Sequence, residues 1–559
     1  MKRIILFLAA TAWLALPAAA QKNHNFEVSK NLEIFNSLFK QLDLYYVDTL
    51  NADKLIKEAA GSMLETLDPY TDYFPDDERS DLKQMLTGKY AGIGALIHYS
   101  KAEDRCIIAE PFENTPAAES GLKAGDIILS ISGKEFGPKG AQETNDFTSS
   151  VSNALRGEPG TSFIVKIQRP GEEQPREIKI TRQAIKTPPV SYYGIIDGKT
   201  GYIHLSGFPE GAANDVRRAV IDLKQQGAKQ MVLDLRNNGG GSMQEAIEIV
   251  NLFIGKGKTV VELKGKIKAA NEIYKTQREA LDPDIPLAIL VNGSTASSSE
   301  ITAGTLQDYD RAVIIGTRTY GKGLVQQTRP LPYDGVLKLT TSKYYIPSGR
   351  CIQAIDYSHR NAAGAADRIP DSLTSVFHTA AGRPVRDGGG ITPDSIVKLD
   401  SVANIVLYLN PGMTTSDVLF NFVTEYTHRH ATVDAPEKFD ISDEEYENFK
   451  RYAKEHKFTY DRQSVKLLDN LKKVARFEGY DVTEEIKNLE AKLTHDEDYD
   501  FDHWKSEIKK LLNNEIMLRY YYRRGLVRNS LNGDKQLETA IAVLNNRQEY
   551  DKILSPESK

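Results

Sequence analysis

Short apolar runs separated by polar turns divide the middle of the chain into alternating strands and helices. Residues 287–291 (LAILV) form one such run, which indicates a buried strand. Asn292 and Gly293 end this run, a cluster of Ser and Thr follows, and a helix is predicted to begin near Glu300. A second buried strand is predicted at residues 311–316. The order strand, polar turn, helix, strand indicates an α/β layer structure.

The same alternation is present upstream, from residue 191. Further strands are predicted at residues 201–205, 230–235 and 336–346, and further helices at residues 212–226 and 242–253. The turn Arg236-Asn237-Asn238-Gly239-Gly240-Gly241 is rich in glycine, as nucleotide-binding turns are. It lacks the Lys-Ser/Thr of a P-loop and the Gly-x-Gly-x-x-Gly spacing, which argues against a nucleotide site. Residues 356–386 are polar and rich in Ala and Gly, which predicts a loop.

The segments on either side of this layer have different patterns. Residues 25–85 carry apolar positions at helical spacing, and so does the chain after residue 411. Residues 86–185 show short alternating runs punctuated by Gly, Pro and Asn, which predicts a small β-rich domain. A stiff linker, residues 187–189 (TPP), follows it. Residues 520–524 (YYYRR) are an aromatic and basic cluster in the last region, where we expect packing between helices.

The N-terminus has the pattern of a secretory signal peptide. Lys2 and Arg3 precede an apolar stretch at residues 4–16, which is too short to span a membrane comfortably. The small residues 17–20 (PAAA) then form a cleavage site. We expect this leader to be removed and the mature protein to be exported as a soluble protein of the periplasm or cell envelope. A retained anchor helix is the alternative.

Composition and charge exclude several classes of protein. The chain has 559 residues, of which 40% are hydrophobic and 26% charged, and a formal net charge of −6. This length allows several domains, and the charge provides no basic footprint for nucleic acid. Cys106 and Cys351 lie in different predicted domains, so we expect small unpaired side chains rather than a disulfide. The sequence contains no cluster of Cys and His residues that would indicate a structural zinc site.

The serine-rich turn and a lysine after the next strand are the candidate chemistry of the chain. A serine at a helix start lies among unpaired backbone N–H groups, which can stabilise the oxyanion that its attack creates. Lys322 lies between Gly321 and Gly323, which allows other backbone to approach closely. A lysine that activates a serine must be neutral, so it must be desolvated to lower its pKa. The residues alone leave an ordinary helix cap and a loop lysine as the alternative.

Together these two segments resemble those of the C-terminal (tail-specific) processing peptidases. The family's S/T-A-S-x-S-E segment corresponds to residues 295–300 (TASSSE), and its T-F/Y-G-K-G-x-V-Q segment to residues 319–326 (TYGKGLVQ). The resemblance implies Ser297 as the nucleophile, Lys322 as the base and Gln326 as the residue that orients the lysine. The position after the nucleophile is often alanine in the family and is serine here. The choice among three consecutive hydroxyls therefore rests on the resemblance.

The glycine-rich turn resembles a second family segment, D-L/V-R-x-N-x-G-G, whose glycine amides help to form the oxyanion hole. The resemblance implies the backbone N–H groups of Ser298 and of Gly240 or Gly241 as the oxyanion donors. Taken alone, a triple glycine is more often a flexible turn. The resemblance covers roughly residues 30–400 and implies an α/β peptidase core of the tail-specific protease/ClpP-crotonase-like type.

Residues 86–185 resemble a PDZ domain. Gly92-Ile93-Gly94-Ala95 matches the loop whose N–H groups bind a terminal carboxylate, and residues 121–126 (GLKAGD) match the helix-to-strand turn. PDZ domains add a peptide as a strand to a sheet edge and capture its C-terminus, and we expect the adjoining groove to take an apolar last side chain. Arg156, near the end of the predicted second helix, is a candidate charge partner. A helix-end arginine that interacts favourably with the dipole is the alternative.

We therefore predict a multidomain α+β protein with five parts. These are a signal peptide (1–20), a helical N-terminal region (21–85), a β-rich PDZ domain (86–185), an α/β serine peptidase core (190–400) and a helical C-terminal extension (411–559). The expected function is an exported serine endopeptidase that recognises C-terminal tails and cleaves with a Ser/Lys dyad, without a metal or organic cofactor. The alternative is a non-catalytic, PDZ-containing peptide-binding scaffold.

The predicted partners follow from this function. Proteins or peptides with free C-termini are the expected substrates. Adaptor or activator proteins and a second copy of the chain are further candidates, and nucleic acid is not expected.

Overall fold

The computed structural model describes residues 2–78, 89–140, 142–361, 364, 366–398, 402–410, 416–493 and 497–555. It divides into two compact units, residues 1–76 with 328–339, and residues 77–327 with 340–559. The predicted domain boundaries at residues 85/86, 400 and 411 lie outside the described residues.

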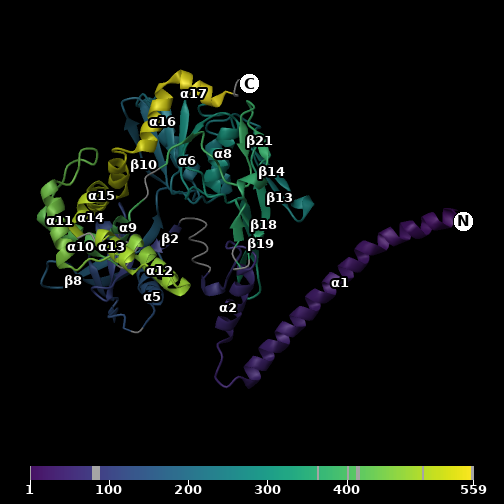
Figure 1. Ribbon diagram of the computed structural model, residues 1–559, viewed down its shortest axis with the longest axis horizontal. Coiled ribbons are helices and arrows are strands. Elements are labelled where there is room, and N and C mark those ends of the chain that lie inside the picture. The colour runs from purple at the N-terminus through teal and green to yellow at the C-terminus, as the bar shows by residue number, and fades with distance from the viewer. Residues whose placement is uncertain are drawn as a thin grey trace. The chain divides into compact units, whose positions relative to one another are not determined.

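The first unit is mainly helical. Its helices are α1 (Lys2–Tyr45) and α2 (Ala52–Glu65), and α1 is one long helix (Figure 1). Asn51 caps α2, because its side chain accepts a hydrogen bond from the Lys54 N–H at 2.9 Å. β1 (Asp72–Phe74) pairs antiparallel with the first residues of β18 (Val336–Tyr345), and the short turn η1 (Asp76–Glu78) follows β1. In the part of the chain that the structure describes, no helix has the length and apolar character needed to cross a membrane.

The second unit begins with the β-rich domain. Its main sheet has the order β3 (Ala95–Ser100), β4 (Arg105–Pro111), β5 (Ile127–Ile131), β7 (Ser162–Gln168), β8 (Arg176–Thr181), with β6 (Lys134–Glu135) beside β5. β2 (Lys89–Gly92) and β9 (Gln183–Lys186) form a separate pair. The helices are α4 (Pro116–Glu119) and α5 (Thr144–Leu155). Alternate strand residues and the apolar face of α5 form one core, as the alternating sequence pattern predicts.

A six-stranded sheet forms the centre of the α/β layer. Its order is β10 (Val190–Ile196), β11 (Thr200–Leu205), β12 (Gln230–Asp234), β15 (Leu287–Val291), β16 (Val313–Gly316), β23 (Ser395–Ile396). All neighbouring pairs are parallel except β10 with β11. The carboxyl ends of the parallel strands therefore meet at one edge, which is where ligands bind in such sheets.

Helices cover both faces of this sheet. α6 (Ala212–Gln225), α7 (Met243–Val250) and α8 (Ser298–Asp308) belong to the core on one face. On the other face lie α16 (Lys535–Asn545), α17 (Arg547–Leu554) and the end of α15 (Lys505–Ser530). Their side chains pack against inward side chains of β11, β12, β15 and β16. Figure 1 shows α16 and α17 beside this layer. These C-terminal helices thus bury one face of the six-stranded sheet, as the continuous apolar runs of its strands require.

A second sheet contains strands that lie, in the sequence, between those of the six-stranded sheet. β18 pairs with β13 (Thr259–Gly265), which pairs with β14 (Glu272–Lys275) after the short turn η2 (Lys268–Ala270), and β17 (Leu324–Pro330) also pairs with β18. The prediction of a plain loop at residues 356–386 is wrong. Two short hairpins occupy this region, β19 (Ile355–Arg360) with β20 (Ala366–Arg368), and β21 (Val376–His378) with β22 (Pro384–Arg386), separated by η3 (Asp371–Leu373). Their faces are largely exposed, so no apolar alternation marks them in the sequence.

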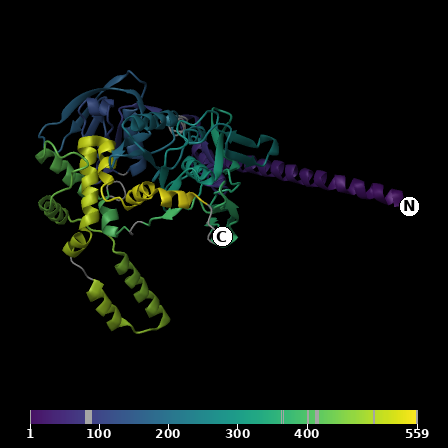
Figure 2. The same cartoon turned by 90° about the horizontal axis from the view of Figure 1, so that it is seen from above.

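The remaining helices form a second core after residue 402. They are α9 (Asn404–Leu409), α10 (Val418–Arg429), α11 (Asp443–Glu455), α12 (Gln463–Glu478), α13 (Thr483–Leu493), α14 (Glu497–His503) and α15 (Lys505–Ser530). α12 and α13 form a hairpin, visible in Figure 2 as two neighbouring yellow-green helices. Side chains of α9, α10, α11, α14 and α15 make the core of this bundle.

Candidate active site

Ser297 lies between β15 and α8, directly before the helix begins. Its backbone has φ 56° and ψ −117°. A residue with a Cβ rarely adopts such a conformation, which costs about 1–3 kcal/mol and persists only where the surroundings hold it. The Ser297 side chain is partly exposed. Strain at an accessible serine is typical of a functional turn.

Burial distinguishes the three consecutive serines. The Ser298 side chain is buried and its hydroxyl donates to the carbonyl of Gly241 at 2.8 Å. Ser299 is also buried, and its hydroxyl donates to the carbonyl of Asn238 at 2.9 Å. Both hydroxyls therefore have structural partners and no access to solvent, which leaves Ser297 as the accessible one.

A buried carboxylate joins the Ser297 turn to the Lys322 segment. One Glu300 oxygen accepts the N–H groups of Ser297 and Lys322, both at 2.9 Å. The other accepts the Thr319 hydroxyl at 2.5 Å and the Gly321 N–H at 2.8 Å. Burial raises the pKa of Glu300 to about 7, against the lowering effect of these four donors. Glu300 thus fixes the two segments relative to each other.

Tyr344 on β18 provides a second tie between the same segments. Its hydroxyl contacts the carbonyl oxygens of Lys322 and of Ser297, the latter at 3.3 Å. The side chain is almost fully buried. Glu300 is visible in the sequence as the last residue of the serine-rich segment. Nothing in the sequence marks Tyr344, which is 47 positions from Ser297.

The glycine turn (residues 239–241) touches the Ser297 turn directly. Gly240 has φ 96°, and a Cβ there would lie 2.8 Å from the Ser298 nitrogen and 2.9 Å from the Ser297 Cβ. The Gly240 N–H donates to the Asn238 side chain at 2.9 Å. Within the described ranges, the N–H groups of Gly241 and Ser298 make no hydrogen bond. These two N–H groups are therefore available to an incoming oxygen.

The lysine of the predicted site lies just before β17, and the glutamine lies on this strand. Lys322 precedes the strand and its side chain is partly buried. Gln326 lies on the strand, and its amide nitrogen donates to the Thr340 hydroxyl at 3.1 Å. The structure thus brings the Ser297 and Lys322 segments together and gives the Gln326 amide nitrogen a different partner.

The PDZ loop (residues 92–95) connects β2 to β3. The Ile93 carbonyl accepts the Ala117 N–H at 2.8 Å, and the Gly94 carbonyl accepts the Phe112 N–H at 2.8 Å. The N–H groups of Ile93 and Gly94 have no hydrogen-bond partner among the residues with described positions. β3 is an edge strand of its sheet. The loop and edge therefore offer the unpaired backbone groups that strand addition needs.

Arg156 lies next to the start of this loop. It follows α5 directly, and its Cα is 3.7 Å from the position that a Cβ on Gly92 would take. Its guanidinium lies 5.8 Å from the Tyr90 ring centre. The structure thus brings Arg156 and the PDZ loop together.

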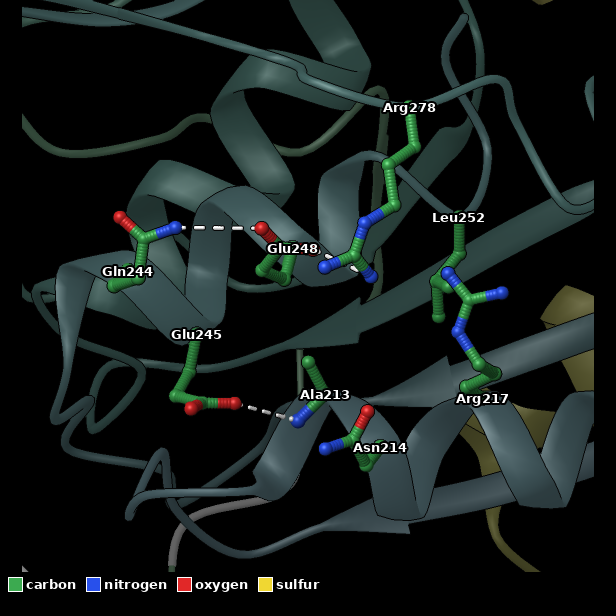
Figure 3. Close-up of a pocket in the computed structure, with 8 residues that line it drawn as sticks. All are labelled: Ala213, Asn214, Arg217, Gln244, Glu245, Glu248, Leu252 and Arg278. Atoms are coloured by element: carbon green, nitrogen blue, oxygen red, sulfur yellow. Dashed lines mark hydrogen bonds and ion pairs between the residues drawn. The ribbon is translucent and has the colours of Figure 1, made fainter.

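A small pocket between α6 and α7 provides a contrast (Figure 3). Its volume is about 190 Å³, and none of the predicted site residues lines it. Glu245 accepts the Ala213 N–H at 2.8 Å, while Glu248 contacts Gln244 at 3.3 Å and Arg278 at 3.5 Å. Its polar groups largely satisfy one another, so we do not assign chemistry to it.

Comparison with known families defines the class of protein. Residues 199–358 match the model of peptidase family S41, residues 93–180 match that of a PDZ domain, and residues 409–544 match "probable PDZ-protease, C-terminal helical domain". The protein is therefore a serine peptidase that carries a PDZ domain and a helical C-terminal domain.

Named relatives agree with this class. The chain is 34% identical over 363 residues to the carboxy-terminal-processing protease of Bartonella bacilliformis, covering 64% of this chain and 81% of that protein. It is 36% identical over 328 residues to a probable CtpA-like serine protease of Staphylococcus aureus, covering 58% of this chain and 62% of that protein. The chain belongs to peptidase family S41, among the C-terminal processing proteases, and the non-catalytic scaffold is not favoured.

A solved structure was also matched over part of the chain. The photosystem II D1 C-terminal processing protease matches 64% of this chain and 86% of its own, with 24% identity and a TM-score of 0.36. Family membership therefore rests on the sequence relatives and the family models.

Proposed function

We propose that this chain is an exported endopeptidase that captures the free C-terminal tails of its substrates with its PDZ domain and cleaves them with Ser297 and Lys322. The observation that carries the proposal is the shared Glu300 oxygen, which accepts the N–H groups of both residues. The buried carboxylate holds the backbone of the strained serine next to the backbone of the lysine segment, and a Ser/Lys dyad needs these two residues close together.

In the proposed mechanism, Lys322 acts as general base and then as general acid. Its neutral amine accepts the Ser297 hydroxyl proton as the oxygen attacks the scissile carbonyl, and the ammonium then donates a proton to the leaving amine. A water molecule releases the acyl group in a second round of the same transfers. Gln326 would orient the amine through its carbonyl oxygen, since its amide nitrogen contacts Thr340.

The oxyanion donors in this mechanism are the N–H groups of Ser298 and Gly241. Both are unpaired within the described part of the chain, whereas the Gly240 N–H bonds Asn238. We therefore favour Gly241 over Gly240 as the second donor. Gly240 serves instead as the small residue that allows the turn to contact Ser297.

The PDZ loop would bind the tail of the substrate. The unpaired N–H groups of Ile93 and Gly94 suit a terminal carboxylate, and the free edge of β3 suits the preceding residues. Arg156 would add a favourable charge beside the loop. The leader pattern of residues 1–20 supports export and a place in the periplasm or cell envelope.

Two peptides that differ only in a free or an amidated C-terminus test this function. With an apolar last residue, we expect the purified protein to cleave the free acid faster, with products identified by mass spectrometry. The Ser297→Ala variant should cleave neither peptide while still binding the free tail. Cleavage by this variant would exclude Ser297 as the nucleophile, and equal rates on the two peptides would exclude tail capture.

A further inference from the structure

The PDZ domain packs on the C-terminal helices. Phe420 of α10 forms a small apolar cluster with Ile107 of β4 and Ile127 of β5, on the sheet face opposite the PDZ core. A Cβ on Gly125 would lie 2.8 Å from the Thr424 side chain of α10. The PDZ sheet is thus covered by its own helix on one side and by α10 on the other.

Two arginines of α15 hold the strand and loop behind the PDZ loop. Arg523 binds Glu110 through two contacts, of 3.0 and 2.7 Å, and Arg524 binds Glu113 at 3.0 Å. Arg523 itself is exposed, but Glu110 is buried, and a buried carboxylate requires a paired charge. Removal of the Arg523 charge would therefore leave the buried Glu110 carboxylate without this ion pair.

The segment that these arginines hold is the support of the PDZ loop. Glu110 lies opposite Leu96 in the β3–β4 ladder. The Phe112 N–H and the Thr115 hydroxyl both donate to the Gly94 carbonyl, at 2.8 and 2.9 Å. A movement of this segment would move the unpaired N–H groups that face the tail.

The other end of the same helix region contacts the segment just before the glycine turn. Asp534, which caps α16 just after α15, contacts Arg236 at 2.6 Å. Arg236 also binds Asp234 at the end of β12. The glycine turn begins three residues after Arg236. A cavity of about 630 Å³ is lined by Phe112 of the PDZ domain and by residues from both ends of this path, Arg523, Asp534, Arg236 and Asn237.

The helix between these two ends is strained where it meets the PDZ domain. Tyr522 has φ 56° and ψ −163°, a conformation nearly restricted to glycine, inside α15. It is the residue before Arg523. A cavity of about 1050 Å³ lies between the PDZ domain and this part of α15. α10 provides the apolar packing on the PDZ sheet, whereas α15 contacts the PDZ domain through the Arg523 and Arg524 ion pairs beside this cavity. The α15 contact can therefore rearrange separately from the α10 packing.

We propose that α15 couples the PDZ loop to the glycine turn, with Arg523 and Asp534 as the positioning residues at its two ends. Tail binding moves the segment around Glu110, the ion pair carries this to α15 at Tyr522, and the Asp534–Arg236 contact passes it to the turn that lies against Ser297. This inference rests on the proposed tail capture and assigns the coupling to the C-terminal helices.

Charge reversal at the PDZ end tests the coupling. The readout is the ratio of kcat/KM for the free-acid peptide to that for its amide, which general destabilisation would not change. We expect a wild-type ratio of about 5 to 150. Arg523→Glu and Glu110→Arg should each bring the ratio near one with hydrolysis of the amide unchanged. The double variant, Glu110→Arg with Arg523→Glu, should restore it.

Arg528→Glu is the matched control, because Arg528 lies on the same helix and pairs with Glu437 at 3.2 Å within the helical region. It should keep the wild-type ratio. A wild-type ratio retained in both single variants would overturn the coupling and leave tail capture intact. A wild-type ratio of one would instead overturn tail capture itself.

The core end is tested by Asp534→Asn, which retains a good helix cap but removes the charge opposite Arg236. We expect kcat on the free-acid peptide to fall to that on the amide, with an unchanged Kd for a tail peptide. An unchanged kcat would overturn the role of Asp534.

Discussion

The PDZ loop and the glycine turn both present unpaired backbone N–H groups, which we propose for tail binding in the first and oxyanion stabilisation in the second. Each is a turn with N–H groups that lack a partner among the described residues, at Ile93 and Gly94 in one and at Gly241 in the other. The two turns differ in the surroundings of a neighbouring arginine. Arg156 lies beside the PDZ loop, whereas Arg236 before the glycine turn is paired with Asp234 and Asp534.

This difference fits the two charges that the turns would meet. A terminal carboxylate carries a full charge throughout binding, and a neighbouring cation stabilises it. An oxyanion exists only near the transition state, and donors that act only on it raise kcat rather than tighten ground-state binding. Donors that act on a transient oxyanion therefore suit the glycine turn, and a terminal carboxylate suits the PDZ loop with Arg156 beside it.

The largest expected effect is a loss of catalysis without a loss of tail binding. Ser297→Ala, Lys322→Ala and Lys322→Arg should each lower kcat/KM by about 10⁴-fold or more, with an unchanged Kd for a tail peptide. The arginine variant should fail because a guanidinium stays protonated at working pH. Ser298→Ala and Ser299→Ala are the matched controls, and we expect them to remain active. Activity of Lys322→Arg near the wild-type level would exclude lysine as the base.

Gly240→Ala should disturb the glycine turn and its contact with Ser297, and leave the PDZ loop unchanged. The new Cβ would lie 2.8 Å from the Ser298 nitrogen, at φ 96°, and should displace an oxyanion donor. We expect kcat to fall by about 10²–10³-fold, measured by steady-state hydrolysis. Gly239→Ala is the control, since a Cβ there meets nothing within 4 Å. Equal losses in both variants would contradict the contact argument.

The buried carboxylate of the catalytic side should appear in the pH dependence of stability. Burial raises the pKa of Glu300 from 4.5 to about 7. Between these pH values the folded state binds more protons than the unfolded state, so the free energy of unfolding falls as pH rises. Relative to Glu300→Gln, urea unfolding should show the wild type losing about 3 kcal/mol across this window. A difference independent of pH would contradict the shift.

Gly94→Ala should damage only the PDZ loop. Its Cβ would lie 2.4 Å from the Thr115 Cβ, at φ 76°. We expect a tail peptide to bind about tenfold more weakly or worse, by fluorescence anisotropy, with unchanged hydrolysis of an amidated peptide. Gly160→Ala has a similar φ of 86° and open space around the Cβ, so it controls for backbone strain. A Kd equal to that of the control would refute the clash.

The smallest effect concerns the cation that distinguishes the two turns. Arg156→Ala should weaken tail binding by about two- to fivefold, because the charge is near the loop but in contact with solvent. Arg156→Lys should retain most of the affinity, and high salt should reduce the difference. A loss that persists in the lysine variant at high salt would assign Arg156 a packing role instead.

Local patterns predicted the elements of the peptidase layer because they are buried on both faces or amphipathic. The strand expected at residues 287–291 is β15, and the helix expected at 212–226 is α6 (Ala212–Gln225). Two things escaped. The hairpins of residues 355–386 are mostly exposed, with Val385 as a buried position, so they show little apolar alternation. Tyr344 reaches Ser297 only through sheet packing.

The cluster at residues 520–524 shows where sequence reasoning was half complete. Tyr520 and Tyr521 contact backbone of the helical region, at His430 and Val433, as the packing interpretation expects. Arg523 instead reaches Glu110, 413 positions away in the chain. No local pattern contains such a pair. The same limit applied to the three serines, which are chemically equal in sequence and separated only by burial.

The position of α16 and α17 on the peptidase sheet sets a time order for activity. Every strand of that sheet has been made once the ribosome reaches residue 396, yet one of its faces is covered by the end of α15 and by residues 535–554, which follow much later. Buried parallel strands need both faces covered, so the Ser297 turn and the glycine turn cannot settle against each other before then. The described C-terminal helices thus complete the fold of a sheet whose strands all precede them in the chain.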